Sequence, residues 1–311
     1  RACIIMETEL WPNLLLTLRQ NRIPLFLANA RLAARSARGY ARLGKVMSTL
    51  LNCYHLIMTQ SAQDKAAFLS LGADSARIQI TGNIKYDLVY TTAELQQGQQ
   101  LQGALQDRIV WVAASTHDGE EELILQTHQL LLKQYPEALL ILVPRHPERA
   151  SAVAKMIAAC NMRMQWRSDC QFPDSSAQVY LVDTLGELRM MYLVSQMVFM
   201  GGSLVPIGGH NFLEAAVLKK PLLSGPHLHH FVPMSESLLA AGGLVIVEDV
   251  VSLTAQLSQW IEDPSECTQV GLGAHSIIEQ HKGAVKRHID LVATSLPFMP
   301  KESASAVEAK S

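Results

Sequence analysis

The chain has 311 residues, of which 49% are hydrophobic and 17% charged, and its formal net charge is −2. This length and apolar content suit two domains, or one large one, and exclude a disordered chain, a collagen-like repeat or a small disulfide-stapled domain. The near-neutral charge argues against general nucleic-acid binding, which needs a strongly basic face. The five cysteines form no CxxC pair and read as ordinary cytosolic thiols. No apolar run is long enough to span a bilayer, and no signal peptide is visible.

Short apolar segments alternate with amphipathic ones along the chain. The amphipathic stretches, such as 120–135 and 253–261, have apolar residues three or four positions apart. Short apolar strands separated by helices predict an α/β fold with doubly wound, Rossmann-like parallel sheets. The predicted strands are Cys3–Met6, Leu25–Ala28, Leu56–Thr59, Ile78–Thr81, Ile109–Ala114, Leu139–Val143, Val179–Val182, Val198–Met200, Pro221–Leu223 and Leu244–Val247.

The pattern divides into two predicted domains. The chain opens with RACIIMETELW, without an initiator Met, and residues 2–6 already read as a buried strand. We therefore expect a partial N-terminal Rossmann-like domain over residues 1–90, with a piece missing in front of it. Residues 91–108, polar and Gln-rich, predict a linker with a helix, and residues 109–290 a complete second domain. Residues 291–311 are expected to form a tail, disordered from Lys301 onward.

The strongest local motif is GGSLVPIGGHNFLEAA, residues 201–216. Two glycine pairs, one of them Gly201 and Gly202, follow a predicted strand and precede a helix expected to open at about Asn211–Phe212. Glycine permits close backbone approach, and free N–H groups at a helix start attract phosphate. Glu214, in the first helical turn, either favours the helix dipole or binds a ribose diol. The alternative is a plain Gly-rich turn with a helix-capping acid.

Two further predicted strands end in polar side chains. LLILVPRHPER, residues 139–149, delivers Pro144 and Arg145 to the carboxyl edge of the sheet, where Arg145 suits phosphate or carboxylate. A solvated basic turn is the alternative. In VWVAASTHDGEEEL, residues 110–123, Ser115 and Thr116 suit a phosphate. Asp118 or Thr116 also suits a helix N-cap, and helix capping and phosphate binding can occur together at this strand end.

Three more motifs lie after strands. In METELWPNLL, Glu7 and Glu9 are two residues apart, so in extended backbone they share a side and suit a base, a hydroxyl-binding pair or a helix cap. ANARLAARS contributes Asn29, Arg31 and Arg35, which suit an anionic acceptor or a solvated helix face. VDTLGELRMMY predicts a turn that presents backbone groups to a nucleobase, or else a capping box. Its polar and glycine residues are Asp183, Thr184, Gly186 and Glu187.

Several reaction classes lack their motifs. The sequence HLHH at 227–230 has no Cys partner and no HExxH, so it reads as a loop and not as a metal site. GxSxG, Walker A and Rossmann GxGxxG motifs are absent, which weakens the hydrolase, P-loop and dehydrogenase alternatives. No metal or cofactor is expected.

The motifs ETELWPN, NARL, VPRHPER and GGHNFLEAA occur in this order within residues 7–216, and the resemblance that they carry covers roughly residues 3–290. Together they resemble those of the 3-deoxy-D-manno-octulosonic acid (Kdo) transferases, GT-B glycosyltransferases that add Kdo to the lipid A precursor. The resemblance implies CMP-Kdo as donor and inversion of the anomeric centre without a metal. It also implies a membrane lipid as acceptor, no nucleic-acid partner, and a place at the cytoplasmic face of the bacterial inner membrane, peripheral or held by an N-terminal helix absent here.

The resemblance also implies roles for individual residues. Arg145 contacts the phosphate and Glu214 the ribose hydroxyls, while Glu7 and Glu9 supply an acidic residue needed for activity. The implied CMP-binding positions are Ser115, Pro144, Arg145, Thr184, Gly186, Glu187, Gly201, Gly202, Asn211 and Glu214.

The sequence departs from the family at its start, where an anchor helix and the motif with the general-base Glu are expected and absent. We therefore expect CMP binding from this chain with little or no transfer. A non-catalytic nucleotide-binding protein and a UDP-sugar epimerase of GT-B architecture remain as alternatives. The number of Kdo units, the oligomeric state and the choice between Glu7 and Glu9 stay open.

Overall fold

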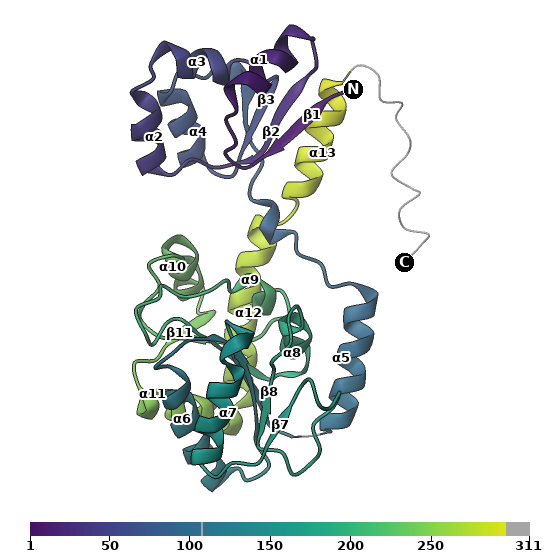
Figure 1. The fold of residues 1–311 in the computed structure, drawn as a ribbon, viewed down its shortest axis with the longest axis vertical. Coiled ribbons are helices and arrows are strands. Elements are labelled where there is room, and N and C mark those ends of the chain that lie inside the picture. Colours follow the sequence, from purple (N-terminus) through teal and green to yellow (C-terminus); the bar gives the residue numbers. More distant parts are fainter. Residues whose placement is uncertain (107, 297–311) are drawn as a thin grey trace. The chain divides into compact units, whose positions relative to one another are not determined.

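The computed structural model describes residues 1–106 and 108–296, which form two compact units. Unit 1 contains Arg1–Asp87 and the residues from His281 onward, and unit 2 contains Leu88–Gln280. Both are parallel α/β structures, as the alternation of strands and helices predicts (Figure 1).

Unit 1 is built on a four-stranded parallel sheet in the order β1-β2-β3-β4. Side chains on a strand alternate between its faces, so β2 points Leu25 and Leu27 to one core and Phe26 and Ala28 to another. Helices on the first face bury that core with residues such as Leu15 and Phe68. The strands are β1 (Cys3–Met6), β2 (Leu25–Ala30), β3 (Leu56–Thr59) and β4 (Ile78–Ile80), and the helices are α1 (Pro12–Gln20), α2 (Ala34–Ala41), α3 (Lys45–Leu51) and α4 (Ala62–Ser70).

The second face of this sheet is covered by α13 (Ala284–Ser295), through Leu291 and Val292. Ile4 and Met6 of β1 remain half-exposed there and border an apolar cavity of about 510 Å³ beside α13. The tail was expected to start at residue 291, but that residue lies inside α13. The helix continues to Ser295 because its apolar side chains pack on the sheet. The expectation of disorder from Lys301 concerns residues outside the described part of the chain.

Unit 2 has a seven-stranded parallel sheet in the order β11-β10-β9-β5-β6-β8-β7. The chain starts in the middle at β5, moves outward through β6, and then crosses to β9 on the other side of β5. This is the doubly wound order, and ligands bind at the carboxyl ends of the strands where the winding reverses. The strands are β5 (Val110–Thr116), β6 (Leu139–Pro144), β7 (Met164–Trp166), β8 (Val179–Leu181), β9 (Met197–Met200), β10 (Leu222–Ser224) and β11 (Leu244–Ile246).

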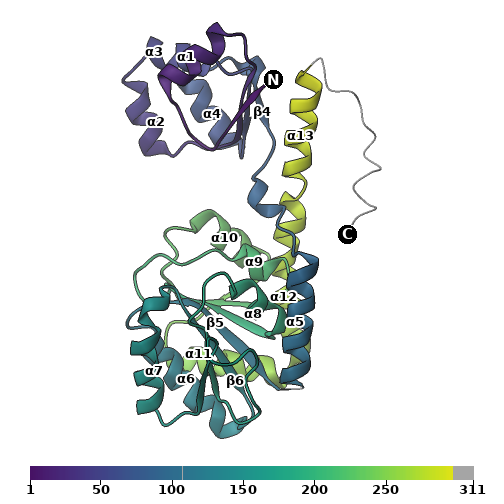
Figure 2. The ribbon, with the colours of Figure 1, turned by 45° about the vertical axis from the view of Figure 1, so that its right-hand side comes forward.

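Helices cover both faces of this sheet (Figures 1 and 2). One face packs Trp111, Leu140 and Phe199 against three amphipathic helices, α6, α7 and α11. The helices of unit 2 are α5 (Thr92–Leu105), α6 (Glu121–Gln134), α7 (Ala150–Ala159), α8 (Leu188–Val194), α9 (Leu213–Ala216), α10 (Val232–Ala240), α11 (Val250–Glu262) and α12 (Pro264–His281), the last of which ends at the boundary with unit 1.

Two assignments differ from the sequence-based expectation. The linker with a helix expected at 91–108 contains that helix as α5, which a Thr91–Glu94 capping box starts and whose Gly98 packs closely against Leu193 of α8. It therefore belongs to unit 2. The edge strand β7 was not predicted, because its three residues Met-Gln-Trp are only partly buried and show no apolar run.

Candidate functional site

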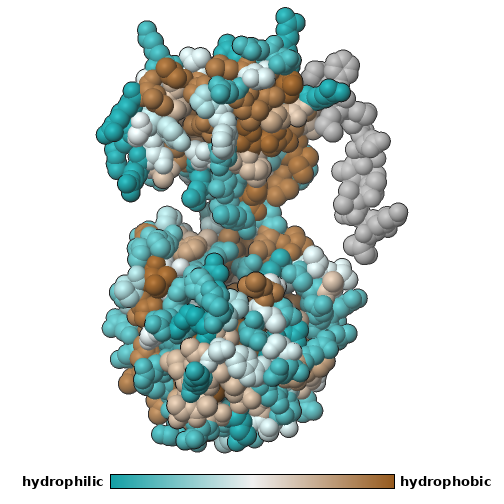
Figure 3. Space-filling model, viewed as in Figure 1, coloured by the Kyte–Doolittle hydropathy of each residue, from teal (hydrophilic) through white to brown (hydrophobic). Residues whose placement is uncertain are grey.

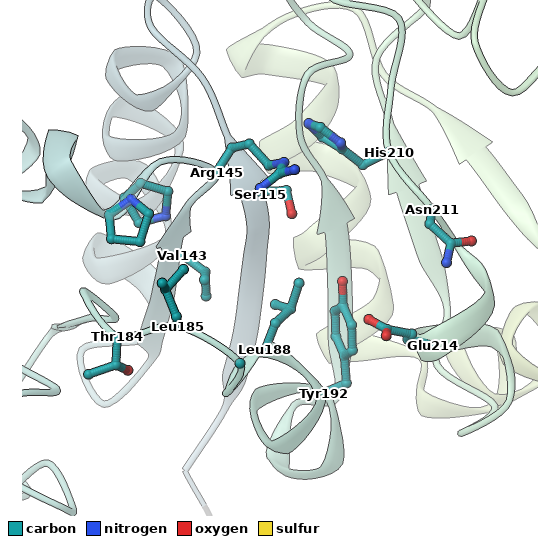
Figure 4. Close-up of a pocket in the computed structure, with 13 residues that line it drawn as sticks. Ser115, Val143, Arg145, Thr184, Leu185, Leu188, Tyr192, His210, Asn211 and Glu214 are labelled. Atoms are coloured by element: carbon teal, nitrogen blue, oxygen red, sulfur yellow. The ribbon is translucent and has the colours of Figure 1, made fainter. Parts of the chain in front are cut away.

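A pocket of about 360 Å³ opens at the carboxyl ends of β5 and β6 in unit 2 (Figure 4). Its walls come from the two strand ends, the loop into α8, and the loop into α9. Seven of the ten predicted CMP-binding residues line it, and six further residues complete the wall. The seven are Ser115, Pro144, Arg145, Thr184, Gly186, Asn211 and Glu214, and the six are Val143, Pro147, Leu185, Leu188, Tyr192 and His210.

Ser115 owes its place to a bulge at the end of β5. The pairing of β5 with β6 shifts register between Ala114 and Thr116, and Ser115 adopts φ +55°. A left-handed conformation is uncommon for a residue with a Cβ, and such strain gathers at functional sites. The bulge places Ser115 in the pocket wall, where Figure 4 shows its hydroxyl beside Arg145.

Arg145 supplies the positive charge of the pocket. Its backbone N–H donates to the carbonyl of Thr116 at 2.9 Å, which fixes the turn after β6. Its side chain is exposed and has no hydrogen bond or ion pair with the described residues. An unpaired guanidinium at a strand end is well suited to a phosphate.

Two histidines form a stacked pair next to Arg145. The rings of His117 and His210 are 5.0 Å apart and nearly parallel, and their Nε2 atoms are 2.8 Å apart. Burial lowers the pKa of His210 to about 4, with nearby His117 and Arg145 acting in the same direction. Burial also lowers the pKa of His117, helped by His146 and Arg145. Both rings are therefore neutral at pH 7 and share one proton between the Nε2 atoms.

The opposite end of the pocket carries Glu214 and Tyr192 (Figure 4). Burial raises the pKa of the Glu214 carboxyl, although Arg189 opposes the shift. The Tyr90 hydroxyl donates to the Glu214 carbonyl at 2.8 Å, and the Asn211 side-chain oxygen accepts from the N–H of Leu213 at 3.2 Å. These bonds hold α9, so the Glu214 carboxylate is positioned to accept hydrogen bonds from hydroxyl groups.

The glycine pair at 201–202 is buried behind the pocket and does not line it. The Gly201 N–H donates to the Ala114 carbonyl, and a Cβ at this residue would lie 2.6 Å from the carbonyl oxygen of Ser115. Gly201 therefore allows the chain after β9 to approach β5 closely. Gly202 donates to the carboxylate of Glu120 at 2.7 Å. Neither glycine lines the pocket, and the expected contact of both with CMP stays a prediction.

Glu120 is fully buried and receives further N–H donors from Ser203, Leu204 and His117 at 3.0 to 3.2 Å. Burial raises its pKa, while these backbone donors oppose the shift by stabilising the carboxylate. The carboxylate of Glu120 therefore occupies the group of backbone N–H donors that the glycine motif suggested for a phosphate.

Glu187 is also turned away from the pocket. Arg167 donates to both of its carboxylate oxygens, at 2.7 and 2.9 Å, and the Thr184 hydroxyl bonds to it as well. Arg167 holds the pKa of Glu187 below its usual range. The ion pair fixes the turn so that Thr184, Leu185 and Gly186 face the pocket. The expected contact of Glu187 with CMP stays a prediction.

Two predicted helix starts differ in detail. Helix α9 begins at Leu213, one or two residues later than expected, and has only one turn, so its dipole is weak. Helix α6 begins after Glu120, without a cap by Thr116 or Asp118. Asp118 instead pairs with Arg149 at 2.6 Å, which keeps Arg149 out of the pocket wall.

In unit 1, Glu7 and Glu9 do not share a side. Glu7 has φ +60°, so the backbone after β1 is not extended as expected. Its carboxylate lies 3.8 Å from the ammonium of Lys85, whereas Glu9 accepts from the Trp11 indole at 2.8 Å. Glu7 is the more buried of the two.

The residues expected on the acceptor side differ in exposure. Asn29 is buried at the end of β2, with φ +53°, and its N–H donates to His288 Nε2 at 2.9 Å. Its side-chain oxygen accepts from the N–H of Ile84, so Asn29 holds the unit together. Arg31 and Arg35 are exposed.

Sequence reasoning missed His210, His117 and Tyr192 as members or neighbours of the pocket, and Glu120 as its support. The HN dipeptide and the STH triplet were visible in the motifs, but nothing in the sequence joined residues 93 positions apart. Among the described residues, no cluster of three or more His, Cys, Asp or Glu could hold a metal ion. None of the described helices is long and apolar enough to cross a membrane.

Comparison with known proteins assigns the family. A family model described as 3-deoxy-D-manno-octulosonic-acid transferase (kdotransferase) matches residues 1–88. The 3-deoxy-D-manno-octulosonic acid transferase of Haemophilus influenzae is 38% identical over 94% of this chain and 69% of its own length. The chain belongs to the Kdo transferase family. It is therefore a glycosyltransferase, and its two Rossmann-like units have the GT-B fold.

Solved structures agree with this assignment. The C-terminal CMP-Kdo binding domain of WaaA from Acinetobacter baumannii is 34% identical and superposes with a TM-score of 0.59, covering 60% of this Kdo transferase chain and 99% of that domain. The UDP-GlcNAc 2-epimerase of Neisseria meningitidis covers 93% of this chain and 76% of its own, with a TM-score of 0.55. At 17% identity, the epimerase shows a shared fold alone.

Proposed function

We propose that this Kdo transferase moves Kdo from CMP-Kdo to the lipid A precursor (lipid IVA) in lipopolysaccharide inner-core synthesis, with inversion and without a metal ion. The observation that carries the proposal is the unit 2 pocket, with unpaired Arg145 at one end and Glu214 at the other. A nucleoside monophosphate offers a phosphate and a ribose diol, which complement this cation and this carboxylate. The similarity to a CMP-Kdo binding domain supports the choice of nucleotide.

In this proposal Arg145 and Ser115 bind the phosphate of CMP, and Asn211 and Glu214 bind the ribose. The turn at 184–186, which Glu187 and Arg167 fix, presents backbone groups to the cytosine ring. Pro144 closes the wall between the phosphate and the base.

The reaction is a substitution at the anomeric carbon of Kdo. A base removes the proton of an acceptor hydroxyl, and its oxygen forms a bond to that carbon from the face opposite the nucleotide. The bond from this carbon to the phosphate oxygen breaks, and its electron pair leaves with CMP. Arg145 stabilises the charge that develops on the departing phosphate. Glu7 and Glu9 of unit 1 are the proposed acidic residues of the acceptor side, with Arg31 and Arg35 meeting an anionic acceptor.

The acceptor is a lipid, which places the proposed reaction at a membrane surface, and the family implies the cytoplasmic face of the inner membrane. The enzyme would act there on a substrate that stays in the bilayer. Separate Glu7→Gln and Glu9→Gln variants of the protein, assayed for Kdo transfer to lipid IVA, distinguish the two carboxylates. The essential one is the residue whose loss lowers kcat.

Calorimetric titration of this chain with CMP and with UDP tests the donor assignment. We expect CMP to bind more tightly, and Glu214→Gln to reduce the preference for CMP over 2′-deoxy-CMP. A clear preference for UDP would contradict Kdo transfer.

A further inference from the structure

The wall of the unit 2 pocket carries little positive charge for the proposed donor. Among the described residues that line it, Arg145 is the one arginine and Glu214 the one acidic side chain, so their charges cancel. Nearby Arg149 is already paired with Asp118 and Glu121, at 2.6 and 2.8 Å. CMP-Kdo has two negative charges, one on its phosphate diester and one on the carboxylate of Kdo. The pocket therefore lacks a cation for one of them.

The surroundings of the pocket make this shortage costly. The visible face of unit 2 is largely hydrophilic, so a donor reaches this unit with both anions hydrated (Figure 3). A charge that loses its water needs a partner in the protein. A second cation is therefore expected close to Arg145.

The His117–His210 pair lies where that cation is needed. His210 lines the pocket beside Arg145 (Figure 4), and the 2.8 Å contact between the two Nε2 atoms uses one nitrogen of each ring. Within residues 1–106 and 108–296, neither ring has a hydrogen bond at its Nδ1 atom, so one Nδ1 is open to a further proton. The pair can therefore hold one positive charge, which the Nε2 contact shares between the rings.

Gly202 makes room for the stacked rings. Its φ is +66°, and a Cβ at this position would lie 3.0 Å from His210 Nε2 and 3.3 Å from His117 Cδ2. The N–H of Gly202 donates to the buried carboxylate of Glu120, which holds the glycine in place. The two imidazoles are therefore fixed at the ends of β5 and β9.

The charges around the pair keep it neutral while the pocket is free. Glu120 accepts from the backbone N–H of His117, but no acidic side chain of the described residues forms an ion pair with either ring. The other charged or titratable groups that face the rings are all basic, and they are Arg145, Arg149, His146 and His230. An anion bound at Arg145 opposes these groups and favours the protonated pair.

We propose that the His117–His210 pair takes up one proton when the donor binds and becomes the second cation of the pocket, beside Arg145. The inference rests on the proposed function, since that function supplies the doubly charged donor. The proton returns to water when CMP leaves. Cytidine has no anionic group and draws no proton, so the pair selects for the charged part of the nucleotide. Binding then becomes tighter as the pH falls, by up to about tenfold per pH unit for one proton.

Calorimetric titration of the whole chain with cytidine 5′-methylphosphate tests the proposal, because this diester exchanges no proton of its own between pH 6 and pH 8. Titrations in several phosphate-free buffers of different ionisation enthalpy count the protons taken up. We expect net uptake at pH 7 that is larger at pH 6 and smaller at pH 8, and no uptake with cytidine. His210→Gln cannot be protonated, so it should bind the diester without uptake and about tenfold more weakly than wild type at pH 6, with a smaller difference at pH 8.

Two exposed histidines supply the controls. His146 packs against the edge of the His117 ring, and His55 belongs to unit 1. His146→Gln and His55→Gln should both keep the proton uptake, and far-UV circular dichroism shows that each variant is folded. Wild-type binding without uptake, uptake that persists in His210→Gln, or uptake that disappears in His146→Gln would overturn the proposal.

The same titrations separate this inference from the proposed function. Tight binding of CMP and its diester without proton uptake would remove the inference and leave the proposed donor standing. A clear preference for UDP, with uptake that His210→Gln abolishes, would refute the proposed donor and leave the role of the pair standing. If no nucleotide binds, both fall.

Discussion

The carboxylate of Glu120 accepts a hydrogen bond from the backbone N–H of Gly202 at 2.7 Å, and this contact joins the ends of β5 and β9. Together with the N–H groups of Ser203, Leu204 and His117, it makes a buried anion site that the protein fills itself. The free donors for a ligand phosphate are therefore side chains on the outer side of this junction, Arg145 above all.

Replacing Glu120 should destabilise unit 2. Glu120→Ala leaves four backbone donors without an acceptor, two of them buried and two partly buried. Each loss at a buried donor costs about 1–3 kcal/mol, so we expect a large fall in the urea midpoint of unfolding. Glu120→Gln keeps one acceptor oxygen, so its urea midpoint of unfolding should lie between those of wild type and Glu120→Ala. Glu122→Ala, on the exposed side of the same helical turn, is the matched control. A Glu120→Ala chain as stable as this control would show that the N–H cradle is satisfied in another way.

Removing the Arg145 guanidinium should weaken nucleotide binding without unfolding the chain. Hydrogen bonds to charged groups contribute about 1.5–3 kcal/mol, so Arg145→Ala should weaken CMP binding by about 10- to 100-fold. Arg145→Lys should recover part of the loss, since an ammonium lacks the bidentate fork. Lys155→Ala, an exposed cation of α7, should bind CMP normally. Unchanged CMP affinity in Arg145→Ala would remove this residue from the site.

The sequence predicted the architecture well because parallel strands of an α/β fold are continuous apolar runs. All ten predicted strands exist within one or two residues of their expected bounds. The missed strand β7 lies at a sheet edge, where burial does not impose an apolar run. The domain boundaries differ because α5 and α13 are assigned by what they pack against, which periodicity does not reveal.

The pocket was predictable wherever a residue follows directly after a predicted strand, as Ser115 and Arg145 do. It was not predictable where a distant partner decides the role. The N–H of Gly202 donates to the distant Glu120, and Glu187 is paired with Arg167, and neither partner is visible from the local sequence. Local sequence shows which groups are available, and tertiary contacts determine which of them are already used.

The neutral His117–His210 pair should make stability fall in acid. Burial lowers the pKa of His210 to about 4 in the folded chain against about 6.5 when unfolded, so the unfolded chain binds more protons between these values. Stability is therefore lost as pH falls from 6.5 toward 4.

With allowance for solvent screening, we expect His210 to contribute on the order of 1–2 kcal/mol to this loss. Urea unfolding of wild type and His210→Gln at a series of pH values measures it, and the variant should show the shallower fall. His128, whose pKa is also lowered to about 4, is common to both chains. Parallel curves for the two chains would rule out His210 as a source of the acid sensitivity.

His288 should control how firmly α13 is held on the sheet of unit 1. Its Nε2 accepts the N–H of Asn29 and lies 3.1 Å from the Thr81 hydroxyl, while Nδ1 donates to the Ala284 carbonyl at 2.7 Å. His288→Ala leaves the buried Asn29 N–H without an acceptor, so hydrogen exchange should become faster in α13 and at the end of β2. Exchange in β5 and β6 should stay unchanged, because those strands belong to unit 2.

The exposed pair on the same helix supplies the control for His288. Lys286 and Asp290 are 3.2 Å apart and largely solvated, so Lys286→Ala should leave exchange almost unchanged. Burial lowers the pKa of His288, so acid favours the unfolded chain here too. Hydrogen exchange in α13 should therefore become faster as the pH falls below about 6.5, after correction for the intrinsic pH dependence of amide exchange. If His288→Ala instead speeds exchange equally in β5 and α13, the histidine stabilises the whole chain and not the contact between α13 and β2.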